Sequence, residues 1–162
     1  MPAEQYEALQ ARRESAVPEV WEVLEAVKDP EIPVISIWEL GILRAVDMEG
    51  DTVVVTITPT YSGCPAMDAI AEDIGSALAA AGYGDYRVQT RWAPAWSTSW
   101  IAPEGRRKLR EFGIAPPGEQ QPSCPHCGST EVELLSEFGS TSCKALYRCR
   151  ACAEPFDFFK NL

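Results

Sequence analysis

Two pairs of closely spaced cysteines constrain the fold of this chain more than any other feature. Cys124 and Cys127 form the first pair, Cys149 and Cys152 form the second, and two residues separate the cysteines within each pair. This spacing lets both sulfurs of a pair face one ion, and Gly128 permits the tight turn after the first pair. Four thiolates presented in this way predict a closed, structural metal site, most often for zinc, although the same four sulfurs also suit iron.

The chain divides into two parts of different composition. Residues 113–121 (GIAPPGEQQ) are polar and rich in proline, as expected of a linker. We therefore predict one domain over residues 1–115 and a metal-held module over residues 116–162, with strands at residues 131–135 and 143–148. About forty residues cannot bury a large apolar core, so the metal would supply most of this module's folding free energy.

Helical and extended patterns alternate in the first part. Apolar residues at helical spacing predict a helix over residues 15–28, with Ser15 as its cap, and Asp29-Pro30 would end it because the residue before a proline is disfavoured in the α region. The other predicted elements are strands at residues 42–48, 52–58 and 86–92, a helix at residues 65–81 that stops at Gly82, and a helix at residues 103–112. This order predicts an α/β (α+β) fold in which helices pack on a small mixed sheet, followed by the C-terminal β-module.

Charge and composition exclude several classes of function. The net charge of −10 argues against nucleic-acid binding, because neutralising phosphates requires an excess of Lys and Arg. The single histidine and the lack of a phosphate-binding glycine motif leave Ser-His-Asp, most Cys-His and nucleotide chemistry unsupported, so we expect no independent enzyme. The N-terminus lacks the apolar stretch of a secretory signal, and no apolar run reaches 18 residues. We therefore expect a cytoplasmic protein, without a membrane partner, whose cysteines are reduced or bind metal.

Cys64 lies far from the paired cysteines, between a β-rich run and a helical run. Pro65 suits the first position of a helix, which would place Cys64 near the helix N-terminus, where unpaired amides favour an anion. A partly exposed thiolate there could attack, bind a soft metal or hold a transient cluster. Alternatively, Cys64 is a small buried residue that merely precedes a helix.

Three other residues are candidates for related chemistry, each with a structural alternative. Asp29 and Glu31 lie in a stiff segment between two prolines and could together hold a metal, accept a proton or orient a partner's amide. Alternatively, they are solvated acids where a helix ends. Cys143 could be a second reactive or metal-transferring thiol, or simply a buried cysteine in a strand.

A segment rich in tryptophan and basic residues occupies residues 91–110. Interleaved aromatic and basic side chains can bind single-stranded nucleic acid. However, Pro94 would interrupt any helical stripe, and tryptophans of this kind usually pack. We favour a solvated basic helix, which could dock an acidic partner.

Several of these segments together resemble the SufT-like iron–sulfur assembly domain over residues 15–115. The segments that carry the resemblance are Asp29-Pro30-Glu31-Ile32-Pro33, Leu40-Gly41-Ile42, Thr58 through Cys64-Pro65, Pro94-Ala95-Trp96, Gly105-Arg106-Arg107-Lys108-Leu109 and Gly113-Ile114. With the paired cysteines, Phe138-Gly139-Ser140-Thr141 and Glu154-Pro155-Phe156-Asp157, the chain is similar to the PaaD (PaaJ) family, small accessory proteins of the bacterial phenylacetyl-CoA epoxidase system.

The resemblance implies a zinc ribbon after the assembly domain and a non-catalytic role in phenylacetate degradation. The partners would be the epoxidase subunits or their [2Fe–2S] reductase, and the cofactors a structural Zn²⁺ and a transient iron–sulfur cluster or iron. Cys64 matches the family's cysteine, while Asp29 and Glu31 match its acidic loop. A cluster ordinarily needs four ligands, so a second chain in a homodimer, Cys143 or the client would supply the rest.

Two other classes of function remain open from the sequence. The chain could be an interaction module in which the ribbon and the basic helix bridge epoxidase subunits while Cys64 only packs. It could also be a redox protein, if the four-cysteine site held iron instead of zinc.

Overall fold

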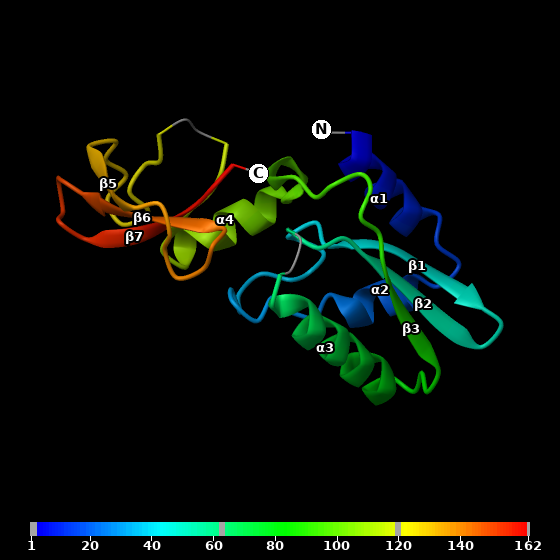
Figure 1. Ribbon diagram of the computed structural model, residues 1–162. Coiled ribbons are helices and arrows are strands. Elements are labelled where there is room, and N and C mark those ends of the chain that lie inside the picture. Colours follow the sequence, from blue (N-terminus) through cyan, green and yellow to red (C-terminus); the bar gives the residue numbers. More distant parts are fainter. Residues whose placement is uncertain (1–2, 62–63, 119–120, 162) are drawn as a thin grey trace. The chain divides into compact units, whose positions relative to one another are not determined.

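The chain forms two compact units, Met1–Ala102 and Pro103–Leu162 (Figure 1). The computed structural model describes residues 3–61, 64–118 and 121–161. Ser62 and Gly63, which belong to the predicted thiol segment, and two residues of the predicted linker therefore lie outside the described residues.

A three-stranded mixed sheet of order β1-β2-β3 forms the centre of the first unit. β1 (Leu43–Glu49) and β2 (Thr52–Ile57) form an antiparallel hairpin, and β3 (Tyr86–Thr90) pairs with β2 in parallel. The central strand β2 is buried from Val53 to Ile57, which explains its almost continuous apolar run. These strands and the mixed sheet confirm the predicted fold class.

Helix α3 (Ala66–Ala80) makes the crossover between the two parallel strands. Its buried stripe includes Ile70, Ile74 and Leu78, at the spacing that places side chains on one helix face. The helix ends where Gly82 adopts φ 93, and the amide of Tyr83 donates to the carbonyl of Leu78 at 2.9 Å. This is the hydrogen bond of a Schellman motif, so the predicted stop at Gly82 is confirmed.

The N-terminal region differs from the prediction. Helix α2 spans only Pro18–Leu24, and an unpredicted helix α1 (Ala3–Arg13) precedes it. The prediction of one helix over residues 15–28 capped by Ser15 was wrong: the N-cap is Val17, without a side-chain capping bond. Pro18 fixes the start of α2 because the first helical position needs no amide donor. The sequence did not indicate α1 because this helix fully buries just Ala8 among its residues.

The second unit is a helix followed by a four-stranded sheet of order β4-β7-β6-β5. Its elements are α4 (Pro103–Glu111), β4 (Ile114–Ala115), β5 (Val132–Ser136), β6 (Lys144–Cys149) and β7 (Pro155–Phe159). β4 pairs with β7 in parallel, while β7, β6 and β5 are antiparallel neighbours.

Strand β4 lies within the segment predicted as a linker, so residues 113–121 are not simply a connection. Gly113 adopts φ 89 and turns the chain from α4 into β4, whose Ile114 pairs with Asp157. The compact units consequently divide before α4, whereas the composition of the sequence placed the domain boundary at residue 115.

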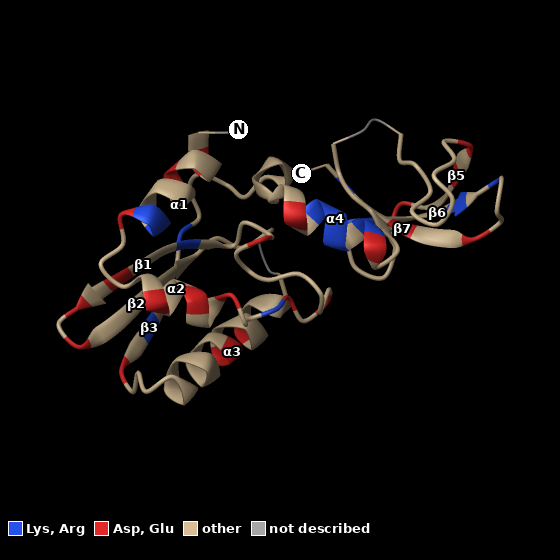
Figure 2. Cartoon of the chain, turned by 180° about the vertical axis from the view of Figure 1, so that it is seen from behind, with Lys and Arg blue, Asp and Glu red and all other residues tan. Residues whose placement is uncertain are grey.

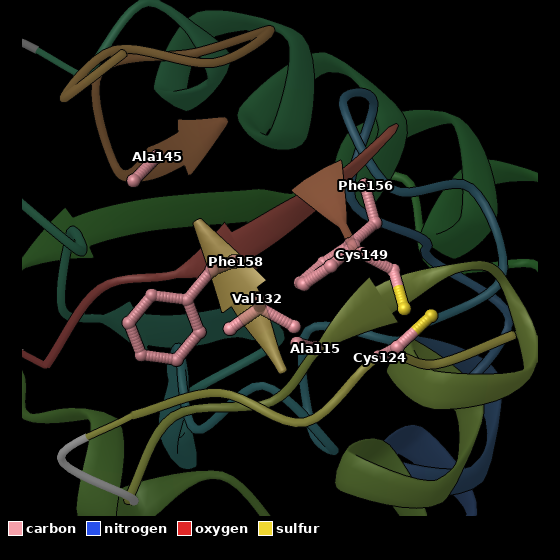
Figure 3. Packing of buried hydrophobic residues seen from close by; sticks show 7 residues of the cluster. All are labelled: Ala115, Cys124, Val132, Ala145, Cys149, Phe156 and Phe158. Carbon is pink, nitrogen blue, oxygen red and sulfur yellow. The ribbon is translucent and has the colours of Figure 1, made fainter. Parts of the chain in front are cut away.

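A small apolar cluster fills the second unit (Figure 3). Its buried members are Ala115, Cys124, Val132, Ala145, Cys149, Phe156 and Phe158. Two of the seven are cysteines of the predicted metal site, so metal binding and core formation involve the same side chains. None of the helices in the described part of the chain has the length and apolar character needed to cross a membrane.

Candidate metal centre and thiol site

The four paired cysteines converge on one point in the second unit. The sulfur atoms of Cys124, Cys127, Cys149 and Cys152 all lie within 4.8 Å of one another. Cys124 Sγ is 3.8 Å from Cys152 Sγ, and Cys127 Sγ is 3.5 Å from Cys149 Sγ. Figure 3 shows the sulfurs of Cys124 and Cys149 directed toward each other. The predicted ligand set is therefore assembled by the fold.

Two similar turns present these sulfurs, which we call the first knuckle (residues 124–128) and the second knuckle (residues 149–153). In the first, the amide of Gly128 donates to the carbonyl of Cys124 at 2.8 Å; in the second, Ala153 donates to Cys149 at 2.9 Å. Both donors adopt positive φ, 80 for Gly128 and 67 for Ala153. The turns are thus near copies, and alanine occupies the left-handed position of the second.

Backbone amides also donate to the sulfurs. His126 N donates to Cys124 Sγ and Cys152 N donates to Cys149 Sγ, both at 3.4 Å. The amide of Cys152 lowers the pKa of the Cys149 thiol to about 7. At Cys149 the donor therefore favours the thiolate, which is the form that ligates a metal.

The spacing of the sulfurs fits a tetrahedral ion. Zn–S bonds of about 2.3 Å in a regular tetrahedron separate the sulfurs by about 3.8 Å. The sulfur pairs at 3.8 and 3.5 Å agree with this separation. Since four protein ligands leave no open position, the ion would have a structural role.

Cys64 lies in the first unit, immediately before Pro65, the N-cap residue of α3. Its side chain is partly exposed, and the hydroxyl of Thr60 donates to Cys64 Sγ at 3.7 Å. The carbonyl of Cys64 accepts from the amide of Met67 at 3.3 Å, which ties Cys64 to the first turn of the helix. The thiol is thus held at a helix N-terminus and is reachable from solvent.

Asp29 belongs to the loop between α2 and β1 and is buried. Its Oδ1 accepts hydrogen bonds from the amides of Glu31 at 2.8 Å and Ile32 at 3.0 Å. Its own amide donates to the carbonyl of Ile35 at 2.9 Å. Asp29 therefore fixes the conformation of the loop, while the side chain of Glu31 is partly exposed.

This acidic loop runs beside the N-terminal end of α3 in both views of the chain (Figures 1 and 2). Asp29 and Glu31 thus come from a segment that neighbours the segment of Cys64, although more than thirty positions separate them in the sequence.

Two further residues, Ser36 and Glu39, hold the acidic loop, and neither was predicted from the sequence. The amide of Ser36 donates to Glu39 Oε1 at 3.1 Å, and the amide of Glu39 donates to Ser36 Oγ at 3.0 Å. These reciprocal bonds form a capping box, which the spacing Ser-x-x-Glu could have indicated. Trp96 Nε1 donates to the carbonyl of Leu40 at 2.9 Å and anchors the following turn.

Cys143 is buried in the second unit, directly before β6. Its Sγ lies 2.9 Å from the hydroxyl oxygen of Thr141, and its carbonyl accepts from the amide of Lys160 at 3.0 Å. The geometry agrees with a packed cysteine. Cys64 belongs to the other compact unit, Met1–Ala102.

The tryptophans at residues 91–110 belong to the first unit, and most of the basic residues belong to α4 in the second unit. Trp96 and Trp100 are buried, whereas Trp92 is exposed. The basic residues of this segment, which Figure 2 shows in blue, concentrate on α4, and Arg107 forms ion pairs there with Glu104 and Glu111. This arrangement fits a solvated basic helix, as expected, and not an interleaved platform for nucleic-acid bases.

Each of the two units matches a different family of known proteins. The family model described as "Iron-sulfur cluster assembly protein" matches residues 18–89, and the model described as "PaaD zinc beta ribbon domain" matches residues 115–160.

Individual relatives and a solved structure cover different shares of the chain. The chain is 45% identical over 152 residues, covering 89% of this chain and 92% of the relative, to an Escherichia coli protein whose name describes it as one subunit of a 1,2-phenylacetyl-CoA epoxidase. It is 34% identical over 89 residues (54% of this chain and 84% of the relative) to a Porphyromonas gingivalis "Fe-S protein maturation auxiliary factor". A solved structure of a domain of unknown function, DUF59, from Bacillus anthracis superposes with a TM-score of 0.52 at 29% identity, covering 57% of this chain and 89% of that one.

Proposed function

The chain belongs to the PaaD family, in which an iron–sulfur assembly domain is followed by a zinc ribbon, and from this premise we propose that it matures an iron–sulfur or iron site of the phenylacetyl-CoA epoxidase and reductase system. An accessory role in iron–sulfur-related function agrees with the relatives named as maturation factors. Phenylacetate degradation would be the pathway it serves, in the cytoplasm.

The observation that carries the proposal is the partly exposed Cys64 thiol at the start of α3, beside the acidic loop. A helix N-terminus stabilises an anionic thiolate, and a thiolate is the usual ligand of iron in clusters. Iron or a cluster would bind here as cargo. The loop held by Asp29 would shape the site, with Glu31 as the adjacent carboxylate.

One thiol cannot hold a cluster alone, because four ligands are ordinarily required. We therefore expect the client, or the Cys64 of a second copy in a homodimer, to provide the other ligands. A cluster that is incompletely ligated on this protein would pass readily to a client, because a client that supplies the full ligand set would bind the cluster more tightly. The four-cysteine zinc site would take no part in this transfer. Its role would be to stabilise the fold of the second unit.

The proposal is tested by maturation of the apo-reductase. The apo-reductase is incubated without oxygen with ferric iron, sulfide and the purified protein, and formation of its [2Fe–2S] cluster is followed by visible absorption. We expect Cys64→Ser to abolish the acceleration given by the parent, while Cys143→Ser retains it. Equal acceleration by the parent and Cys64→Ser would contradict a transfer role for this thiol.

A second candidate function is an interaction module that bridges or stabilises epoxidase components. The exposed apolar side chains of the ribbon, including Leu134 and Phe138, favour this alternative. Alkylation of the folded protein distinguishes the two: a reactive Cys64 is modified rapidly near neutral pH, whereas a packed Cys64 is not. Iron in the four-cysteine site, as a redox protein would require, would give a coloured protein, whereas zinc gives no visible absorption.

A further inference from the structure

An apolar groove lies on the sheet of the second unit, at the end away from the cysteines. It has a volume of about 270 Å³ and is lined by Leu134, Glu137, Ala145, Tyr147, Phe158 and Lys160. Leu134 is aligned with Tyr147 across β5 and β6, and Ala145 with Phe158 across β6 and β7. The groove is therefore a continuation of the face that forms the core, and its floor is apolar.

Three large apolar side chains on and directly after β5 are unusually exposed to solvent. Leu134 is 50% exposed, Leu135 is 49% exposed and Phe138 is 65% exposed. The register of β5 against β6 shifts between Leu134 and Ser136, which is the signature of a β-bulge and explains why two consecutive leucines both reach solvent. Clustered apolar side chains at a groove mark a surface that binds another molecule.

Strand β5 is the edge of its sheet, since the order is β4-β7-β6-β5. The backbone groups of an edge strand that face away from its neighbour can pair with an added strand. An extended segment that pairs with β5 would place alternate side chains over Leu134 and into the groove. The backbone edge and the apolar groove thus offer one continuous surface.

The charges along β5 select the kind of partner. Glu133 is paired with Arg148 at 2.6 Å and Arg150 at 3.4 Å. Glu131 and Glu137 are exposed, and no ion-pair partner for them exists among the residues that the structure describes. Antiparallel pairing of two copies about Leu134 would place Glu131 of each chain opposite Glu137 of the other. Like charges directly opposite each other destabilise a sheet, so a second copy is disfavoured.

We propose that β5 and this groove dock an extended apolar segment of a partner protein that carries Lys or Arg on both sides of its apolar core. The added strand extends the sheet of the ribbon, its apolar side chain fills the groove, and its basic residues pair with Glu131 and Glu137. This inference concerns a surface distinct from the Cys64 site, and its test needs neither iron nor sulfide.

The test uses the zinc-loaded full chain and a fluorescein-labelled peptide with alternating Val and Leu flanked by two lysines at each end. We expect saturable binding by fluorescence anisotropy that weakens with salt, and amide chemical-shift changes concentrated in β5. The double variant Glu131→Lys/Glu137→Lys should weaken binding about tenfold, because two attractive cross-strand pairs become repulsive. The matched double variant Glu72→Lys/Asp73→Lys, which makes the same charge change on exposed positions of α3, should leave binding within about twofold.

Two control peptides separate docking from simple charge attraction. A peptide with glutamates in place of the lysines should bind at least about tenfold more weakly. A lysine peptide N-methylated at alternate backbone amides keeps the charges but cannot pair with the edge, and it should also lose binding. No binding of the lysine peptide, equal binding of the N-methylated peptide, shift changes outside β5 and the groove, or concentration-dependent dimers that pair through β5 would each overturn the proposal.

Discussion

At the scale of the residue, the acidic loop shows how one buried carboxylate can fix the conformation of the backbone around it. Asp29 Oδ1 accepts two backbone hydrogen bonds, at 2.8 and 3.0 Å, from a buried position. We predict that Asp29→Ala lowers the free energy of unfolding of the first unit by about 1–3 kcal/mol, because one buried and one part-buried amide lose their acceptor.

Asp29→Asn is the matched variant, since its amide oxygen can still accept both bonds. It should cost well under half as much in urea unfolding as Asp29→Ala. Equal losses in the two variants would show that the negative charge, not the hydrogen-bond geometry, holds the loop.

Gly41 gives a second test at this scale. It adopts φ 82, and a Cβ added there would lie 2.8 Å from Trp100 Cβ and 3.0 Å from the Trp100 carbonyl oxygen. We predict that Gly41→Ala lowers the free energy of unfolding by about 2–4 kcal/mol, from backbone strain plus overpacking. Gly50 has a similar φ of 62 with nothing within 4 Å, so Gly50→Ala should cost only about 1 kcal/mol. Comparable losses in the two alanine variants would contradict the close approach of Trp100.

At the scale of the element, helix α1 is held by few apolar contacts. The guanidinium carbon of Arg12 lies 4.8 Å from the centroid of the Trp38 ring, and the guanidinium forms an ion pair with Glu25 at 2.6 Å. These contacts hold the helix in place of a buried apolar stripe. We predict that Arg12→Ala reduces the hydrogen-exchange protection of the α1 amides about tenfold, since a cation–π contact and an ion pair are lost. Arg13→Ala, at a neighbouring position of the same helix, is the control and should leave protection unchanged. Unchanged protection in Arg12→Ala would show that other contacts hold the helix.

The predictability of the elements followed how clearly local sequence signals mark each one. The hairpin, α3 and the knuckles were predictable because buried periodicity, turn glycines and cysteine spacing are local signals. Helix α1, strand β4 and the short α2 were not, because α1 is held by contacts between distant segments and β4 exists through pairing with β7. The neighbourhood of Cys64 and the acidic loop likewise depends on the packing of distant segments, although its residues were identified from the sequence.

At the scale of the whole molecule, the two units depend on different sources of stability. The first unit has a sheet and helices with a buried core of its own, whereas two of the seven buried residues in the second unit's cluster are cysteines of the metal site. We predict that removing the metal with a chelator, or Cys124→Ser, unfolds the second unit and leaves the first unit folded. Amide spectra would show dispersed signals persisting for residues of the first unit alone. Retained dispersion in both units after metal removal would contradict a structural role for the ion.

The proposed transfer of iron depends most on Cys64 as its ligand. The most direct measurement is the iron bound per chain after anaerobic incubation with ferrous iron and sulfide, followed by removal of unbound metal, for the parent, Cys64→Ser and Cys143→Ser. We predict zinc in all three proteins, with sulfide-dependent iron in the parent and Cys143→Ser and none in Cys64→Ser. Iron in neither the parent nor Cys64→Ser would assign the remaining ligands to the client, whereas equal iron in the two proteins would contradict Cys64 as the ligand.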